Sequence, residues 1–231
     1  MTGLMCFIVP AFNESASIGS VVTDLLSLYP SSSVLVIDDN SSDETSKVAI
    51  KFGAKVIRLS NNLGIGGAVQ TGLIFARDMN YEIAVQFDGD GQHLASEVSC
   101  LINPILDLSA DYVVGSRWIV DKGFKSSKSR RVGIRLLSIL LSKKIDQRLT
   151  DVTSGFRAMN KKTIELFSNE YSKDFPEIDA IMTAKNHSIV IKEVPVQMKE
   201  RAHGASSISK ISSIYYMTLA LARIGATRGP L

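Results

Sequence analysis

The sequence has few cysteines, and they do not form a recognisable site. Its 231 residues include two cysteines, Cys6 and Cys100, both in apolar surroundings. Two isolated cysteines exclude a disulfide framework and the ligand spacing of a zinc site, and they indicate two buried thiols in a reducing cytoplasm. The three histidines are not part of any serine–histidine–aspartate pattern, so the sequence gives no support for a hydrolase.

Long apolar runs are missing too. The longest candidate, Ile214–Ala222, has about half of the roughly 20 residues that a membrane-spanning helix needs. The stretch Met5–Val9 has no basic flank and is too short for the apolar core of a signal peptide. We therefore expect a cytoplasmic protein, either fully soluble or peripheral at the inner face of the membrane.

Neither sign of charge dominates the composition. Lysine and arginine number 26 against 23 aspartates and glutamates, which gives a net charge of +3. This balance argues against a nucleic-acid partner, because duplex-binding domains carry a clustered basic face. With 45% hydrophobic and 21% charged residues, the chain is typical of a packed globular protein.

Short β-branched runs alternate with longer amphipathic runs, a pattern typical of a mostly parallel sheet covered by helices on both faces. The predicted strands are Met5–Val9, Val34–Ile37, Lys55–Leu59, Ile83–Phe87, Tyr112–Val114 and Ile189–Val194. The predicted helices are Ile18–Leu28, Glu44–Phe52, Ile65–Met79, Ala95–Leu108, Leu136–Leu141 and Ile211–Ile224. We predict one α/β domain over residues 1–231, with a nucleotide-binding half (1–115) and an acceptor-binding half (116–231) that ends in an amphipathic segment.

Polar residues directly follow three of the predicted strands. These are Asn13-Glu14, Asp38-Asp39 and Asp88-Gly89-Asp90. Ligands of such sheets bind beyond the carboxyl ends of the strands. The three clusters are therefore expected to converge on one crevice.

Asp88 and Asp90 are the strongest local signal. Two carboxylates separated by one glycine at a strand end can jointly hold a hard cation such as Mg²⁺ or Mn²⁺, and Gln92 offers a third oxygen. The alternative is a solvated Asp-Gly turn. His93 stands beside the pair, either near such a metal or as a turn residue.

The second and third clusters leave alternatives open. Of Asp38 and Asp39, one is expected to support the turn while the other faces the crevice and accepts hydrogen bonds from a nucleobase or ribose. The glycine-rich stretch Asn62–Ala68 resembles a phosphate cradle but lacks the spacing of known nucleotide loops. A tight turn that packs a helix closely on the sheet is the favoured interpretation.

Basic residues gather in the second half of the chain. They are Arg117, Lys122, Lys125, Lys128, Arg130, Arg131, Arg135, Arg157, Arg201 and Lys210. Guanidinium groups bind phosphates through two parallel hydrogen bonds, so this half could hold a phosphate-bearing acceptor or the leaving diphosphate. A solvated basic face is the alternative for the Lys122–Lys128 run.

Taken in order, these motifs resemble the family 2 inverting glycosyltransferases of the GT-A fold. The matching segments are Val9–Glu14, Ile37–Asp43, Asn62–Gly72 and Asp88–His93. Further segments are similar to the dolichol- and polyprenyl-phosphate sugar transferases and their bacterial members: Val114–Arg117, Asp151–Arg157 and Glu193–Ile208.

The resemblance implies a role for each motif. A nucleoside-diphosphate sugar would lie over Pro10, Ala11, Glu14 and Asp39, with Asp39 facing the base. Asp88, Asp90 and Gln92 would surround Mg²⁺ or Mn²⁺ at the diphosphate, and Asp90 would be essential for turnover. Arg117, Arg131, Arg201 and Lys210 would engage the phosphate of a polyprenyl-phosphate acceptor or the leaving group.

The chain departs from the family pattern at its end. Relatives often end in transmembrane helices, whereas the last stretch here, Ile211–Ile224, could lie on a membrane or pack on a small membrane-protein partner. The loop Ser206–Lys210 also differs from the eukaryotic sequence, so the acceptor need not be dolichol phosphate.

The expected reaction is an inverting transfer, and the acceptor decides whether it needs a base. A phosphate acceptor is already an anion, whereas a glycan hydroxyl, as in cell-envelope polysaccharide synthesis, requires Glu177 or Asp179 to take its proton. The same two residues could instead complement a helix dipole. Other readings are a sugar-1-phosphate nucleotidylyltransferase, disfavoured by the Pro10–Glu14 loop, and a non-catalytic nucleotide-sugar-binding module.

Overall fold

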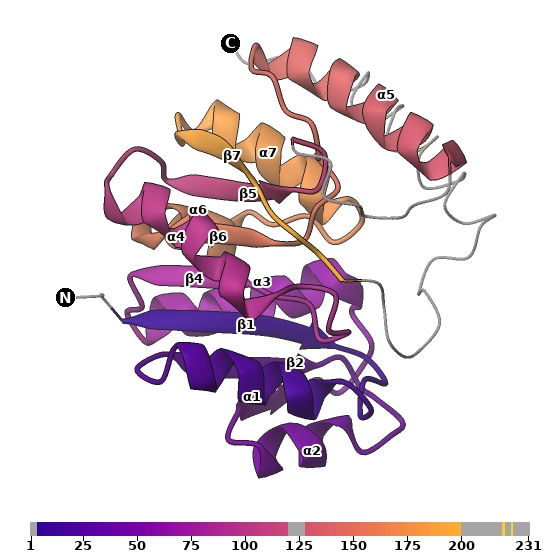
Figure 1. Ribbon diagram of the computed structural model, residues 1–231, viewed down its shortest axis with the longest axis vertical. Helices are drawn as coiled ribbons and strands as arrows, with labels where there is room; N and C mark the ends of the chain where they lie inside the picture. Colours follow the sequence, from indigo (N-terminus) through magenta and orange to yellow (C-terminus); the bar gives the residue numbers. More distant parts are fainter. Residues whose placement is uncertain (1–3, 120–127, 200–218, 220–222, 224–231) are drawn as a thin grey trace.

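The chain folds into a central sheet between two layers of helices (Figure 1). The computed structural model describes residues 4–119, 128–199, 219 and 223. Its strands are β1 (Met5–Ala11), β2 (Ser33–Asp38), β3 (Lys55–Arg58), β4 (Ile83–Gln86), β5 (Tyr112–Ser116), β6 (Arg157–Asn160) and β7 (Ile191–Pro195). Its helices are α1 (Ile18–Leu28), α2 (Thr45–Lys51), α3 (Gly64–Asp78), the short 3-10 turn η1 (Ala95–Glu97), α4 (Val98–Leu106), α5 (Lys128–Ile145), α6 (Lys161–Asn169) and α7 (Pro176–Asn186).

The sheet has seven strands in the order β3-β2-β1-β4-β6-β5-β7. Strand β6 runs antiparallel to both of its neighbours, and the other pairs are parallel. In β1, Ile8 lies opposite Leu35 of β2 on one side and Gln86 of β4 on the other. Because β6 comes from the second half of the chain and sits between β4 and β5, the two halves share one sheet.

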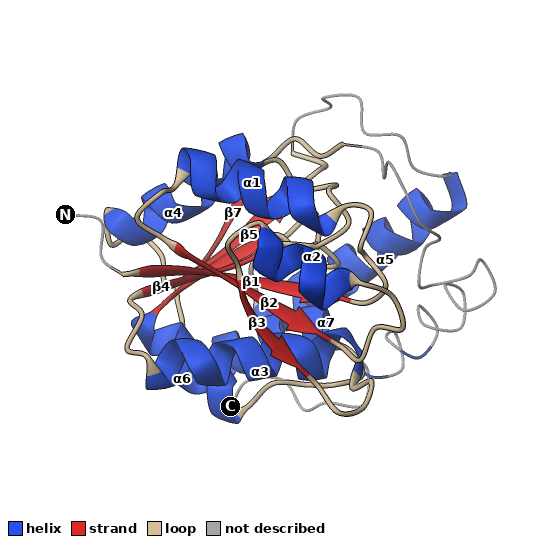
Figure 2. Ribbon diagram, turned by 90° about the horizontal axis from the view of Figure 1, so that it is seen from below, coloured by secondary structure: helices blue, strands red, loops and turns tan. Residues whose placement is uncertain are grey.

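Both faces of the sheet are covered, which explains why the strands read as continuous apolar runs. Alternate residues of β1 belong to different cores: Ile8 packs with α3, α6 and α7, while Phe7 and Val9 pack with α1 and α4. Figure 2 shows α1, α2 and α4 on one side of the sheet and α3, α6 and α7 on the other.

The sequence-based prediction of a mostly parallel α/β fold is confirmed, and the first five predicted strands agree with β1–β5 to within about two residues. The predicted Ala95–Leu108 helix is divided into η1 and α4. The predicted Leu136–Leu141 helix is only the middle of α5, which begins at Lys128 inside the basic run. Strand β6 and helix α6 were not predicted.

The expectation of two buried thiols was wrong for one cysteine. Cys6 lies in β1 and is buried, whereas Cys100 lies on the outer face of α4 and is exposed. Cys100 follows the buried Val98 by two positions, which turns its side chain away from the sheet. Within the described part of the chain, we find no helix long and apolar enough to cross a bilayer.

Candidate functional site

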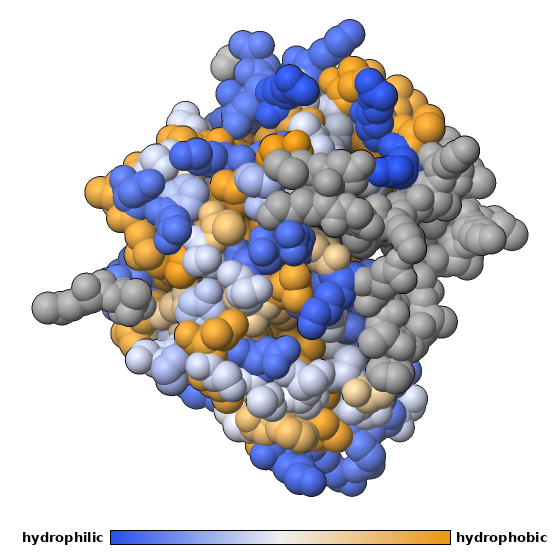
Figure 3. All heavy atoms as spheres, in the orientation of Figure 1, coloured by the Kyte–Doolittle hydropathy of each residue, from blue (hydrophilic) through white to orange (hydrophobic). Residues whose placement is uncertain are grey.

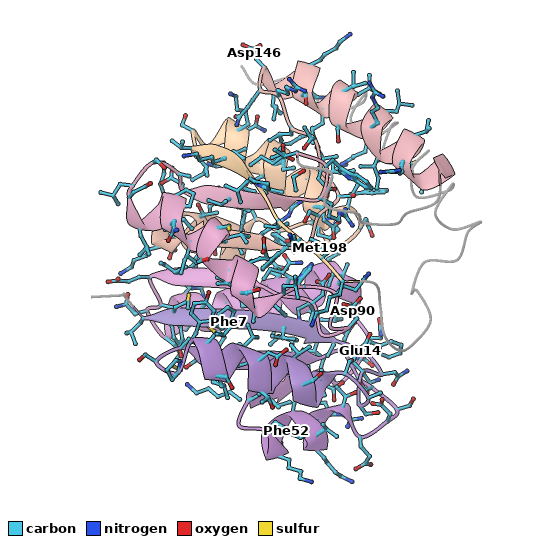
Figure 4. All side chains as sticks on the ribbon, in the orientation of Figure 1. Phe7, Glu14, Phe52, Asp90, Asp146 and Met198 are labelled. Atoms are coloured by element: carbon cyan, nitrogen blue, oxygen red, sulfur yellow. The ribbon has the colours of Figure 1, made fainter. Side chains whose placement is uncertain are left out.

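The candidate site lies at the edge of the sheet where β1, β2, β4 and β5 end and the antiparallel β6 begins. Figure 4 shows Glu14, from the loop after β1, and Asp90, from the loop after β4, at this edge. The Ser17 hydroxyl links the two loops, since it lies 2.9 Å from Glu14 Oε2 and 2.8 Å from the Gly89 carbonyl oxygen. The convergence expected from the sequence is therefore present.

The acidic pair Asp88 and Asp90 occupies a tight turn after β4. Asp90 is buried, and its Oδ1 accepts a 3.0 Å hydrogen bond from the Gln92 backbone N–H. The side chain of Asp88 is 34% exposed. Its carboxylate lies against Gly155, where an added Cβ would stand 3.2 Å from Asp88 Oδ1. The absence of a side chain at Gly155 therefore keeps space open beside the Asp88 carboxylate.

His93 is a packing residue that positions Asp88. Its ring stacks on Phe156 at 4.5 Å between centroids and meets the edge of Phe87 at 5.3 Å. Nδ1 accepts a 3.0 Å hydrogen bond from the Asp88 backbone N–H, and Nε2 lies 3.4 Å from Asp88 Oδ2. Burial lowers the pKa of His93, although the Asp88 and Asp90 carboxylates oppose the shift. A neutral ring with its proton on Nε2 satisfies both contacts.

Gln92 is held by the segment that follows β7. Its carbonyl oxygen accepts a 2.8 Å hydrogen bond from the Lys199 backbone N–H, and its side-chain amide lies 3.4 Å from the Lys199 carbonyl oxygen. An isolated bridge pairs His93 with Met198 beside it. Arg201 and Lys210, the expected loop cations, lie outside the described residues.

Asp38 and Asp39 both hold backbone turns, whereas the sequence suggested that only one would. Asp38 is fully buried and accepts from the Ser41 N–H at 2.8 Å. The two carboxylate oxygens of Asp39 accept from the N–H groups of Leu63 and Gly64 at 2.7 and 2.9 Å. Asp39 thereby ties the crevice to the start of α3, and its oxygens keep lone pairs for a further donor.

The residues predicted to lie under the donor surround Asp39. The Asp39 N–H donates to the Ala11 carbonyl oxygen at 2.9 Å, which places the β1 residues Pro10 and Ala11 beside it. The Glu14 N–H donates to Thr45 Oγ1 at 2.9 Å, so the loops after β1 and β2 are joined. Pro10, Ala11, Glu14 and Asp39 therefore come together.

The glycine-rich stretch serves close packing, as the favoured interpretation predicted. An added Cβ on Gly66 would stand 2.4 Å from the Ser172 carbonyl oxygen. Gly72, about one helical turn beyond this stretch in α3, also packs closely, since an added Cβ would stand 2.3 Å from Ile8 Cγ2 in β1. Gly64 has a φ of +76°, which favours glycine at the start of α3. These contacts bring α3 against the sheet and fix the turn that Asp39 holds.

Arg117 forms a two-pronged ion pair with Asp151. Its Nε lies 2.6 Å from Asp151 Oδ2 and its Nη2 lies 2.7 Å from Oδ1. Burial by itself would lower the pKa of Arg117, but the Asp151 carboxylate raises it above its ordinary value. The pair fixes the guanidinium at the end of β5. Sequence reasoning did not identify Asp151 as the partner, because it is 34 residues away along the chain.

Arg157 is structural, which corrects its place among the predicted phosphate-binding cations. It is 1% exposed at the start of β6. Its guanidinium donates to the carbonyl oxygens of Ser154 at 2.6 Å and Glu177 at 3.0 Å, and to the Tyr112 hydroxyl. These bonds hold the loop before β6 against the first turn of α7.

The two candidate bases in α7 have different surroundings. Glu177 is half-buried, and its carbonyl oxygen accepts a 3.0 Å hydrogen bond from Arg157 Nη1. Its negative charge also contributes to the raised pKa values of Arg117 and Arg157. Asp179 is buried, with Oδ1 3.4 Å from Arg223 Nε, and its Oδ2 has no hydrogen-bond partner among the residues that the structure describes. Both carboxylates also lie in the first turn of α7, where they complement the helix dipole.

A cavity of about 680 Å³ runs along one flank of α5, and we call it the α5 groove. Its apolar wall comprises Trp118, Val132, Ile134, Ile139 and Leu149, and its cations are Arg131, Arg135, Lys143 and Arg148. The Trp118 ring centroid lies 5.1 Å from the Arg131 guanidinium carbon and 5.9 Å from that of Arg117. Trp118 therefore connects the groove to the end of β5.

The described residues contain no group of three or more histidine, cysteine, aspartate or glutamate side chains arranged to hold a metal ion. Any cation at Asp88 and Asp90 would need further ligands from other sources.

Comparison with known proteins agrees with this architecture. The family model described as "Glycosyl transferase family 2" matches residues 6–167. A UDP-N-acetylglucosamine–dolichyl-phosphate N-acetylglucosaminyltransferase of Methanococcus voltae is 32% identical over 84% of this chain and 85% of its own length. A polyprenol monophosphomannose synthase of Mycolicibacterium smegmatis is 27% identical over 87% of this chain and 80% of its own.

Solved structures share the fold. A glucosyl-3-phosphoglycerate synthase from Mycobacterium tuberculosis superposes with a TM-score of 0.72 at 21% identity, covering 98% of this chain and 81% of that one. The GT-A fold predicted from the sequence is thereby confirmed.

Proposed function

The chain belongs to glycosyl transferase family 2, and on that basis we propose that this nucleotide-sugar-dependent enzyme transfers the sugar to a polyprenyl phosphate. The acceptor phosphate attacks the anomeric carbon from the side opposite the leaving group. The new C–O bond forms as the bond to the nucleoside diphosphate breaks, and the configuration inverts.

The observation that carries the proposal is the α5 groove. It joins an apolar wall to the cations Arg131, Arg135, Lys143 and Arg148, and it reaches Arg117 through Trp118. A lipid phosphate needs this combination, because its head requires cations and its first isoprene units require an apolar surface. The acceptor would then lie on the half of the chain predicted over residues 116–231.

The donor would lie over the crevice between β1, β2 and β4. Asp39 would face the base with its remaining lone pairs, while Pro10, Ala11 and Glu14 form the floor. One relative is a UDP-N-acetylglucosamine–dolichyl-phosphate N-acetylglucosaminyltransferase, which supports a nucleoside-diphosphate sugar as the donor.

A divalent cation fits Asp88 and Asp90. The two carboxylates lie two residues apart, and Gly155 leaves space beside Asp88 that a Cβ would narrow. Mg²⁺ or Mn²⁺ bound by one or two carboxylates takes its remaining ligands from phosphate oxygens and water. When bound, the ion would neutralise charge on the leaving diphosphate, with Gln92 beside it.

The proposal predicts that the acid pair is essential. In a transfer assay with a panel of UDP- and GDP-sugars and a short-chain polyprenyl phosphate in detergent, Asp90→Asn should lower kcat by at least about a hundred-fold without lowering Tm. Asp78→Asn, an exposed carboxylate at the end of α3, is the matched control. Full wild-type activity in EDTA would disprove the metal assignment.

The same assay tests the acceptor. Arg131→Ala should raise the acceptor KM about ten-fold or more and leave the donor KM nearly unchanged, since a charge-assisted contact contributes roughly 1.5–3 kcal/mol. Lys51→Ala, an exposed cation in the last turn of α2, is the control. Transfer to a glycan hydroxyl but never to the lipid phosphate would refute the proposed acceptor and favour Glu177 or Asp179 as the base.

A further inference from the structure

Helix α5 is apolar on two opposite faces. One face carries Leu137, Leu141 and Ile145, which are buried in the core beneath the helix. The other face carries Val132, Leu136, Ile139 and Leu140, which are 69%, 45%, 45% and 37% exposed. Because an α-helix turns by about 100° per residue, the exposed apolar residues lie on the side of the helix opposite the buried ones. A surface helix of a globular protein needs only one apolar stripe, so the outer one is not explained by folding.

The charges along α5 have a single sign. The helix has no acidic residue in its first turn and ends with Lys143 and Lys144, and none of its 18 residues is acidic. Arg131 and Arg135 are exposed beside the outer apolar face. Elsewhere the chain mixes both signs, with 23 acidic residues in total. An apolar stripe bordered only by cations is complementary to an anionic, apolar surface.

The outer face is visible as a patch. In Figure 3 the region of α5, at the upper right, shows hydrophobic side chains with strongly hydrophilic ones on their flanks. The patch is continuous with the α5 groove, because Val132 and Ile139 belong to both.

We propose that the outer face of α5 docks on an anionic lipid bilayer, with its apolar residues at the acyl boundary and its cations at the headgroups. This arrangement is that of an interfacial amphipathic helix. Docking would place the mouth of the groove at the membrane surface. The docking inference is drawn from the surface of α5 alone. The further step, in which a lipid acceptor enters the groove from the bilayer, rests on the proposed function.

This surface differs from the one that the sequence suggested. From the sequence, Ile211–Ile224 was expected either to lie on a membrane or to pack on a membrane-protein partner, and the structure describes only Leu219 and Arg223 of this segment. The four outer apolar residues of α5, together with Arg131 and Arg135, are described and exposed, so the inference needs no other segment.

The test is vesicle flotation of the whole chain. The probe vesicles contain phosphatidylglycerol mixed with phosphatidylcholine, or phosphatidylcholine alone. Wild-type protein should bind the anionic vesicles at least about ten-fold more strongly than the neutral ones, and raising the salt from about 0.05 M to about 0.5 M should weaken the binding.

The variant is Leu136→Gln with Leu140→Gln, two exposed positions that do not line the groove. It should lower the partition coefficient at least about ten-fold. Ile50→Gln with Met79→Gln, two exposed apolar positions on α2 and after α3, should bind as wild type does. Equal Tm values and equal transfer to a short-chain acceptor in detergent would show that the α5 variant remains folded and active.

Two outcomes would overturn the inference. One is that wild-type protein does not float with anionic vesicles, or binds anionic and neutral vesicles equally well. This result needs no variant. The other is a stable dimer that the Leu136→Gln, Leu140→Gln change dissociates without any effect on lipid binding. Vesicle binding without transfer to any lipid phosphate would instead refute the proposed function and leave the docking intact.

Discussion

At the scale of single residues, burial and partners separate side chains that look alike in the sequence. Arg117 and Arg157 were both expected to bind phosphate. Arg117 lies at the mouth of the site with an Asp151 partner, whereas Arg157 is buried and bonded to backbone carbonyls. A buried guanidinium that donates to protein oxygens is fixed in place, so Arg157 shapes the loop before β6 and cannot reach a ligand.

Asp39 is expected to act on both folding and binding. Asp39→Ala removes acceptors from two backbone N–H groups, those of Leu63 and Gly64, and leaves them unsatisfied. The free energy of unfolding should fall by about 2–3 kcal/mol. Nucleoside affinity, measured by calorimetry without metal, should also fall.

Asp78→Ala, at an exposed position, should change neither quantity. If Asp39→Ala lowers stability but leaves nucleoside affinity intact, the residue supports the turn and another group contacts the base.

The two cysteines should differ in reactivity with pH. Burial raises the pKa of Cys6 from 9.0 to about 12, and the thiolate is the reactive form. Its thiolate fraction therefore stays very small until the pH approaches 12, whereas the exposed Cys100 is accessible to a reagent in solution.

Iodoacetamide labelling followed by mass spectrometry checks this. At about pH 8.5 the native protein should gain one adduct, on Cys100, and the denatured protein should gain two. Equal labelling of both cysteines in the native protein would contradict the buried placement of β1.

At the scale of elements, the glycines of α3 allow this helix to pack closely against its neighbours. Gly72 lies against Ile8, and Gly66 lies against the Ser172 backbone, so α3 packs closely on β1 and on the chain before α7. Local sequence alone would favour alanine at such helix positions, because glycine costs about 1 kcal/mol in a helix interior.

Gly72→Ala should therefore destabilise the protein. The gain in helix propensity is outweighed by overpacking against Ile8, for a net loss of about 1–2 kcal/mol in a urea titration. Thr71→Ala, at the neighbouring half-buried position, is the matched control and should change stability by less than about 1 kcal/mol. A Gly72→Ala protein more stable than wild type would show that α3 can shift away from the sheet.

At the scale of the whole molecule, the two predicted halves of the chain contribute strands to one sheet. Strand β6 separates β4 from β5, so the nucleotide-binding half predicted over residues 1–115 lacks the strand that completes its own sheet. Without β6, the facing edges of β4 and β5 would carry unpaired backbone N–H and C=O groups, and exposed strand edges of this kind promote aggregation.

A chain that ends after Trp118 should show no cooperative unfolding transition and should aggregate. In the full chain, Trp118 fluorescence and far-ultraviolet circular dichroism should follow one coincident transition in urea. A truncated chain that unfolds cooperatively and binds nucleotide would show that the first half folds alone.

The sequence by itself determined the strands β1–β5, the polar loops that follow them and the order of the motifs. Strands buried on both faces must be apolar throughout, so β1–β5 could be recognised locally. Polar residues after parallel strands must meet at one edge, so the convergence of Glu14, Asp39 and Asp88 followed from the pattern.

Only the tertiary structure decided which side chains those loops hold and which surfaces stay exposed. Strand β6 (Arg157–Asn160) has only four residues, and the first and last of them are polar, so it shows no apolar run in the sequence. It forms a strand because it pairs with β4 and β5 on either side. Three contacts join residues that lie far apart in the chain: Arg117 with Asp151, Arg157 with Tyr112, and Gly72 with Ile8. Local periodicity records how neighbouring residues alternate, whereas burial depends on which distant element packs against them.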